Sequence, residues 1–225
     1  MARAGGRNAV SLNVGQTVVM KNEKQLTPRR KPKQRRSVKR TQQILEVTAR
    51  LLDKVGFDDL TTILITKELG ISVGSLYHYF PNKHAILYAI AEDWLREWDK
   101  LLVDIAQLPI ERMSLPDFVE QLSKTFLIVY REQKGILPLI QAMYAVPELR
   151  DLDEKHDRSV VLKMSLLFKR VGVKLANRER ERIAFCYLEI VHAMLIVVLE
   201  QKKGQANKSL SDLDRVCLSL IEHYM

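Results

Sequence analysis

The side chains best suited to chemistry stand close together between Ser72 and His78. This run carries two serine hydroxyls, a tyrosine phenol and an imidazole, and Gly74 lies among them. Hydroxyl and imidazole groups make the hydrogen bonds that proteins use on DNA phosphates and base edges. A glycine removes a side chain where a backbone must approach a surface closely. The run therefore predicts recognition of a nucleic acid rather than catalysis.

A metal or catalytic site has weaker support. The candidate ligands Cys186, His192, Cys217 and His223 lack paired spacing, although structural zinc needs four ligands and catalytic zinc three. Both cysteines lie in apolar runs, which favours buried thiols in a reducing compartment. We find no nucleophile–base arrangement and no glycine-rich phosphate loop. We therefore predict no metal, no cofactor and no enzyme activity.

The segment Leu60–Lys83 must position the Ser72–His78 run, and its pattern predicts two short helices. Thr61 and Ser72 are suitable N-caps, and Gly70 supplies the turn between the helices. The apolar side of the pair comprises Leu60, Ile65, Leu69, Ile71, Leu76 and Phe80. Two helices joined in this way form a helix-turn-helix, whose second helix enters the major groove of DNA.

Motif residues recur at fixed spacing around these two helices. They are Gly56-Phe57, Thr61-Thr62, Gly70-Ile71-Ser72, Gly74, Leu76-Tyr77, Tyr79-Phe80 and Lys83. With this string, residues 44–87 resemble the DNA-binding domain of the TetR family of bacterial transcriptional regulators. Thr66 and Leu69 stand where the family usually has alanine, and both keep the core size roughly right.

The resemblance implies roles for individual residues. It implies that phosphates are held by Thr62, Tyr77, Tyr79 and Lys83, the last at a helix start where free N–H groups attract anions. It makes Ser72, Val73, Ser75 and His78 the candidate base readers, with Gly74 allowing close approach. The alternative for Tyr77 and Tyr79 is packing against the domain's own core.

Positive charge is concentrated at the start of the chain. Residues 1–40 carry 12 Lys/Arg and one acid, whereas the rest carries 24 Lys/Arg and 26 acids. The densest run, Arg29–Arg40, directly precedes the first predicted helix. We expect residues 1–40 to form a basic, disordered arm that reaches DNA, followed by a DNA-binding domain over residues 41–82.

The remaining residues, 83–225, continue with apolar residues at helical spacing and no convincing strand. We expect an all-α protein, in which the N-terminal three-helix DNA-binding domain is followed by a C-terminal helical bundle for ligand binding and dimerisation. The last two helices are predicted at 178–203 and 210–224, separated by the linker GQANKS. Their wide apolar arcs, which include Val198 and Leu220, are candidates for a homodimer interface.

Aromatic and methionine side chains of the C-terminal part suggest a ligand pocket. The candidates are Trp94, Trp98, Phe126, Tyr130, Met143, Tyr144, His156, Met164, Phe168 and Tyr187. Such residues at helical spacing are also what an ordinary core contains. If they line a pocket, they predict a small apolar or aromatic effector.

The predicted function is that of a DNA-binding transcriptional regulator. We expect a ligand-responsive repressor that binds a palindromic, double-stranded operator as a dimer. The alternative is a DNA-bound interaction or nucleoid-associated protein on the same fold, without a small-molecule effector. Neither a signal peptide nor an uncharged apolar stretch of about 18–20 residues is evident, which predicts a cytoplasmic protein with no membrane segment.

Overall fold

Helices make up the regular structure of residues 35–225, the part of the chain that the computed structural model describes. The prediction of an all-α protein is therefore confirmed. The predicted basic arm lies mostly outside the described residues. The elements in chain order are α2 (Arg35–Asp59), α3 (Thr62–Leu69), α4 (Val73–Tyr79), α5 (Lys83–Ala106), the 3-10 turn η1 (Ile110–Arg112), α6 (Leu115–Glu132), α7 (Ile136–Ala145), α8 (Pro147–Val171), α9 (Asn177–Glu200) and α10 (Lys203–Glu222).

Side-chain caps fix where several of these helices begin. The oxygens of Thr61, Ser72, Asn82 and Ser114 each accept a hydrogen bond from the backbone N–H three residues later, at 2.9–3.2 Å. Such caps satisfy N–H groups that have no partner within the helix. The starts predicted from Thr61, Ser72 and Ser114 are confirmed.

One predicted boundary near the N-terminus is wrong. The first helix begins at Arg35 rather than after residue 40, so the end of the basic run belongs to α2. Gly56 interrupts this helix, at the residue where the sequence predicts its end. It adopts a left-handed φ of 79° and kinks the chain, and a last turn follows up to Asp59. Basic side chains have good helix propensity, and the charge of the run obscured the helix signal.

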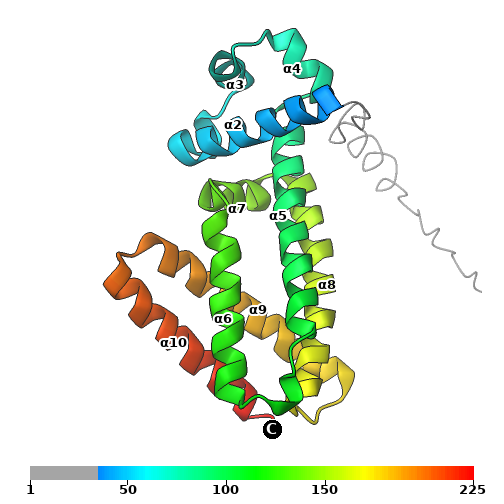
Figure 1. Ribbon diagram of the computed structural model, residues 1–225, viewed down its shortest axis with the longest axis vertical. Helices are drawn as coiled ribbons and strands as arrows, with labels where there is room; N and C mark the ends of the chain where they lie inside the picture. Colours follow the sequence, from blue (N-terminus) through cyan, green and yellow to red (C-terminus); the bar gives the residue numbers. More distant parts are fainter. Residues whose placement is uncertain (1–34) are drawn as a thin grey trace, which may run out of the picture.

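The predicted linker between the last two helices is also wrong. Residues 204–209 form the start of α10, and α9 and α10 are joined only through Gln201 and Lys202. Ala206 is buried, so tertiary packing holds this polar stretch helical. The two helices pack against each other over much of their length (Figure 1).

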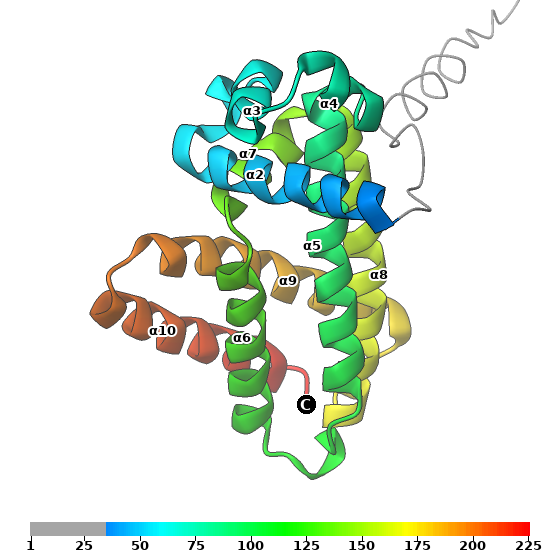
Figure 2. The same cartoon turned by 45° about the horizontal axis from the view of Figure 1, so that its top comes forward.

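The helices are arranged along one long axis. Helices α2, α3 and α4 lie at one end, and α5 runs from this end down the molecule beside α8 (Figure 1). Helix α6 packs on α5, α9 and α10 (Figure 2), while α7 packs against α2 and lies below it in Figure 1. A hydrophobic core runs through both ends of the molecule, from Ile44 in α2 to Ile221 in α10. Helix α5 thus connects the α2–α4 end directly to the C-terminal bundle.

The junction between α2 and α7 depends on Gly135. This residue has φ 69°, and a Cβ there would lie 2.8 Å from the carbonyl oxygen of Ala49 in α2. A side chain at this position would therefore clash with backbone and also favour another φ. The close approach of the Gly135 backbone to α2 therefore fixes the distance between α2 and α7.

Within the described residues, α9 is long and apolar enough to cross a membrane by composition. It packs against α6, α8 and α10, and Tyr187, Val191 and Leu195 on it are buried. We interpret α9 as a helix of the bundle, because one face of it, which carries these three residues, is buried against its neighbours.

Candidate nucleic-acid interface and ligand cavity

Helices α3 and α4 form the predicted pair and lie at the end of the molecule (Figure 1). Gly70 between them has φ 63°, the left-handed conformation of a helix C-cap. Ile65 of α3 and Leu76 of α4 are fully buried, and Phe80 after α4 is nearly so. These buried side chains therefore fix α3 and α4 against the rest of the domain.

The opposite side of α4 is open to solvent. Ser72, Val73, Gly74, Ser75, Tyr77 and His78 are all exposed. They include every candidate base reader, and the Tyr77 side chain is 39% exposed although it is large and aromatic. The structure thus brings these residues together on one accessible face, where core packing does not account for Tyr77.

Two other candidates are less accessible. Tyr79 is half-buried, and its ring meets the His78 ring edge-on at 5.4 Å between centroids. Thr62 is half-buried at the start of α3. Tyr79 belongs to the last turn of α4, whereas Thr62 belongs to α3, the other helix of the pair.

Lys83 is engaged inside the protein. Its Nζ donates to the carbonyl oxygens of Phe57, at 3.2 Å, and Leu60, at 3.1 Å. The ammonium also lies 4.7 Å from the centre of the Phe57 ring. These contacts tie the start of α5 to the last turn of α2 and to Leu60, which follows it. A phosphate contact would have to use the remaining N–H, so the geometry favours a structural role.

Sequence reasoning missed two exposed residues of α3. Ile63 is 70% exposed, and Lys67 is exposed one turn later. Both stand on the helix that crosses the DNA backbone in a helix-turn-helix. The sequence could have indicated Ile63, because an isoleucine on the solvent side of an amphipathic helix often marks a surface that binds a partner.

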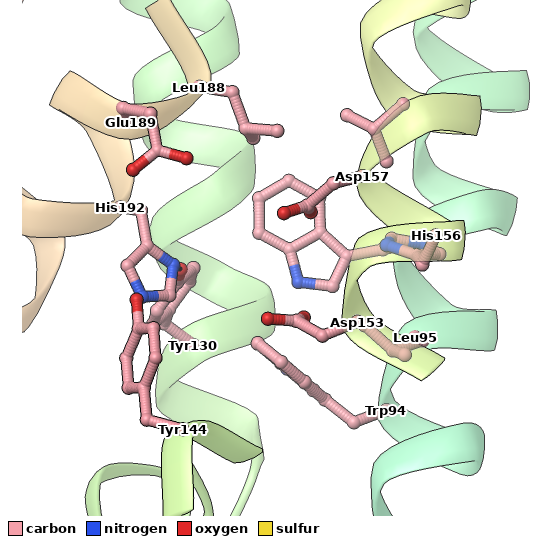
Figure 3. A pocket seen from close by; sticks show the side chains of 12 residues that line it. Trp94, Leu95, Tyr130, Tyr144, Asp153, His156, Asp157, Leu188, Glu189 and His192 are labelled. Carbon is pink, nitrogen blue, oxygen red and sulfur yellow. Dashed lines mark hydrogen bonds between the residues drawn. The ribbon is translucent and has the colours of Figure 1, made fainter. Parts of the chain in front are cut away.

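A cavity lies in the C-terminal bundle, among α5, α6, α7, α8 and α9 (Figure 3). Its free volume is about 40 Å³, which suffices for water but not for a larger molecule unless side chains move. The lining residues are Trp94, Leu95, Trp98, Tyr130, Tyr144, Asp153, His156, Asp157, Val160, Leu188, Glu189 and His192.

The predicted pocket residues divide into two groups. Trp94, Trp98, Tyr130, Tyr144 and His156 line the cavity. The others do not line it and are buried in the core: Phe126, Met143, Met164, Phe168 and Tyr187. Helical spacing identifies a buried face, but it does not show whether that face meets a neighbouring helix or a void.

Sequence reasoning missed the acidic side of the cavity. The carboxylates of Asp153, Asp157 and Glu189 point toward the same space (Figure 3). Burial, together with neighbouring carboxylates, raises the pKa of Asp153 to about 6 and that of Asp157 to about 7. The sequence predicts an apolar or aromatic effector. The lining contains carboxyl groups as well as aromatic rings, so an uncharged apolar effector does not account for all of it.

A hydrogen bond closes the inner wall of the cavity. The Tyr130 hydroxyl lies 2.5 Å from Nδ1 of His192. Burial raises the pKa of Tyr130 and lowers that of His192, so a neutral phenol meets a neutral imidazole. If the phenol donates to Nδ1, the proton of His192 is on Nε2, which has no partner among the described residues. Throughout residues 35–225, the cavity included, no cluster of His, Cys, Asp or Glu could hold a metal ion.

Two protein-family models match this chain, one in each of its two regions. Residues 44–90 match the family model of bacterial regulatory proteins of the tetR family. Residues 114–220 match the tetracyclin repressor-like C-terminal domain. The two matched regions contain the α3–α4 face and most of the cavity lining.

Curated relatives share part of this sequence. The HTH-type transcriptional regulator BetI of Vibrio campbellii is 33% identical over 73 residues, which cover 32% of this chain and 37% of BetI. An HTH-type transcriptional regulator of Staphylococcus aureus strain USA300 is 29% identical over 102 residues, covering 45% and 53% of the two chains. The chain therefore spans about a third to a half of these relatives.

Solved structures share the fold over most of the chain. A TetR transcription regulator from Haloarcula marismortui has a TM-score of 0.65 at 17% identity, covering 83% of this chain and 98% of its own. A transcriptional regulator from Saccharomonospora viridis, solved in complex with choline, has a TM-score of 0.62 at 20% identity, covering 83% and 97%. At these identities the likeness is one of fold.

Proposed function

This chain belongs to the TetR family of bacterial transcriptional regulators, and we propose that it acts as a homodimeric, ligand-responsive repressor. It carries the helix-turn-helix DNA-binding domain of the family and is a regulator rather than an enzyme. The proposal covers three features: a two-fold operator, a dimer through α9 and α10, and release from DNA when the cavity is filled.

The exposed face of α4 is the observation that carries the proposal. Ser72, Ser75, Tyr77 and His78 offer hydroxyl and imidazole groups on one rigidly supported helix. None of the candidate base readers is an Arg, Asn or Gln, so we expect hydrogen bonds from hydroxyl groups and shape readout rather than bidentate contacts. The basic residues before α2 would add phosphate contacts in a neighbouring groove.

Exposed apolar residues on the last two helices support a dimer. Phe185 and Val197 of α9 are 49% and 42% exposed, and Val216 of α10 is 48% exposed. Val198, by contrast, is buried within the subunit, so it does not belong to the proposed interface. A charge at Val197 or Val216 is the sharper test of dimerisation, because it leaves the subunit core intact.

Helix α5 offers a route from the cavity to the DNA-binding domain. Trp94 and Trp98 of α5 line the cavity, and Lys83 at its start is bound to the chain ahead of α3. A ligand that fills the cavity and displaces α5 would move α3 and α4 with it. Only a ligand that prefers the DNA-incompetent arrangement can release the operator.

The small volume of the cavity favours the alternative, a cytoplasmic DNA-bound interaction protein without an effector. Against it, the carboxyl groups of Asp153 and Asp157 are costly to bury beside one another without a cationic partner among the described lining residues. The fold also admits an occupant in a relative, since the Saccharomonospora viridis neighbour holds choline. We therefore favour the ligand-responsive regulator.

The experiment selects the operator first and then tests the α4 face. Duplexes enriched from genomic fragments by the full-length protein should contain an inverted repeat, and anisotropy should show affinity that falls steeply with salt. Tyr77→Ala and His78→Ala should each weaken binding about tenfold. His223→Ala is the control, because it removes an exposed histidine at the end of α10, far from this face. Equal affinities for all three variants would refute the proposed DNA face.

A further inference from the structure

The cavity is lined by aromatic rings and by carboxyl groups, two kinds of side chain that rarely occur together in a protein core. Trp94, Trp98, Tyr130 and Tyr144 supply aromatic rings, and carboxylates enter from α8 and α9 (Figure 3). No Lys or Arg stands among the described lining residues. Nearby, the Lys163 ammonium is 2.5 Å from Asp99, so it is engaged elsewhere. The carboxylates thus have no cationic partner in the lining.

We propose that this cavity binds a small organic cation, a quaternary ammonium or a protonated amine, and that this cation is the effector of the regulator. The inference rests on the proposed function, which gives the cavity its regulatory role. The carboxylates of Asp153, Asp157 and Glu189 supply the negative charge, and the aromatic rings supply faces that attract a cation.

An independent observation at Trp94 also points to a ligand. Trp94 is only 5% exposed, and its indole N–H has no hydrogen-bond acceptor in the described part of the chain. Its ring reaches toward the space beside Asp153 (Figure 3). A buried donor without an acceptor costs free energy, which a ligand carrying a hydroxyl or carbonyl oxygen would offset. This feature favours an organic ligand over a bare ion.

A metal ion fits the same cavity poorly. Within residues 35–225 no set of three acidic, His or Cys side chains is placed to hold one. Metal ions are held by converging oxygen or nitrogen ligands, whereas aromatic rings are the walls that organic cations use. Tyr144 is 57% exposed, so it can swing aside and make room for a larger cation in the cavity.

The test is calorimetric titration of the full-length protein with matched pairs of compounds. Choline is paired with 3,3-dimethylbutan-1-ol, and acetylcholine with 3,3-dimethylbutyl acetate, because each pair differs only in replacing charged nitrogen by carbon. We expect at least one cation to bind at least about tenfold more tightly than its neutral partner. Calcium chloride is titrated as the metal arm.

Variants then locate the site. Asp157→Asn and Glu189→Gln should each weaken the cation at least about tenfold, and Tyr144→Ala about threefold or more, while Tyr144→Phe retains binding. Asp151→Asn is the matched control, since Asp151 is an exposed carboxylate of the same helix outside the cavity.

The outcomes separate the ligand class from the proposed function. If neutral partners bind as well as the cations, if calcium alone binds, or if none of these compounds binds, the cation proposal is overturned. If a cation binds and needs Asp157 but never releases the operator, the cation site stands and the ligand-responsive repressor does not. If a neutral compound releases the operator instead, the repressor stands and the cation proposal fails.

Discussion

The α4 face and the cavity use polar groups in opposite ways. The hydroxyl and imidazole groups of α4 are exposed, so water satisfies them until DNA replaces it. The carboxyl groups of Asp153 and Asp157 are largely buried, and burial raises the pKa of each. The exposed groups of the α4 face therefore cost the free protein little stability. The buried carboxyl groups of the cavity lower its stability, and a suitable ligand would offset that loss.

The largest expected effect separates the two regions. Leu76→Ala empties a fully buried position under α4 and should lower stability by about 2–5 kcal/mol. Operator binding should be lost, while the cavity ligand still binds with its original affinity. Anisotropy and calorimetry on the same preparation measure both. Leu166→Ala is the control, since Leu166 is exposed on α8. Loss of both activities would mean that the two regions unfold as one unit.

The next prediction concerns the junction between the regions. Gly135→Ala places a Cβ 2.8 Å from the Ala49 carbonyl oxygen at a left-handed φ, and should cost about 1–2 kcal/mol. We expect weaker operator binding, although Gly135 touches neither site. Gly204→Ala is the control, because a Cβ there meets nothing within 4 Å. Unchanged operator affinity in Gly135→Ala would show that the spacing of α2 and α7 does not matter for DNA binding.

A third prediction tests the cost of the buried carboxyl groups through its pH dependence. The pKa of Asp157 is about 7 in the folded protein, against an ordinary value of 3.8, so the folded state holds the proton more tightly. Stability therefore falls as pH rises from about 4 through 7. Asp157→Asn removes this loss, so its melting temperature should exceed that of the parent at pH 8, and the difference should shrink at pH 5. Equal differences at both pH values would argue against a buried, titrating carboxyl.

The smallest expected effects compare two lysines near the DNA face. Because Lys83 donates to the carbonyls of Phe57 and Leu60, Lys83→Ala should lower stability by about 1 kcal/mol and hardly change the salt dependence of operator binding. Lys67→Ala should leave stability unchanged and lower the salt slope by about 1. Lys174→Ala, which removes an exposed charge between α8 and α9, is the control. The opposite result for Lys83 would support the phosphate contact that the sequence predicts.

The sequence by itself determined the helical class, several helix starts and the exposed face of α4. These features are local, because a cap such as Thr61 bonds to a residue three positions away and a helical face repeats within a turn. Because burial of a helix face is also a local pattern, the sequence correctly predicts that Leu76 and Phe80 are buried.

Only the tertiary structure decided the cavity, the partner of Lys83 and the helical start of α10. Asp153 and Glu189 stand on different helices, and no local pattern shows that they face one space. Lys83 finds its two carbonyls more than twenty residues away along the chain. Ala206 holds a polar stretch in α10 only because it packs in the core. Each of these outcomes depends on which helices become neighbours, and burial then decides the charge, the hydrogen bonds and the secondary structure.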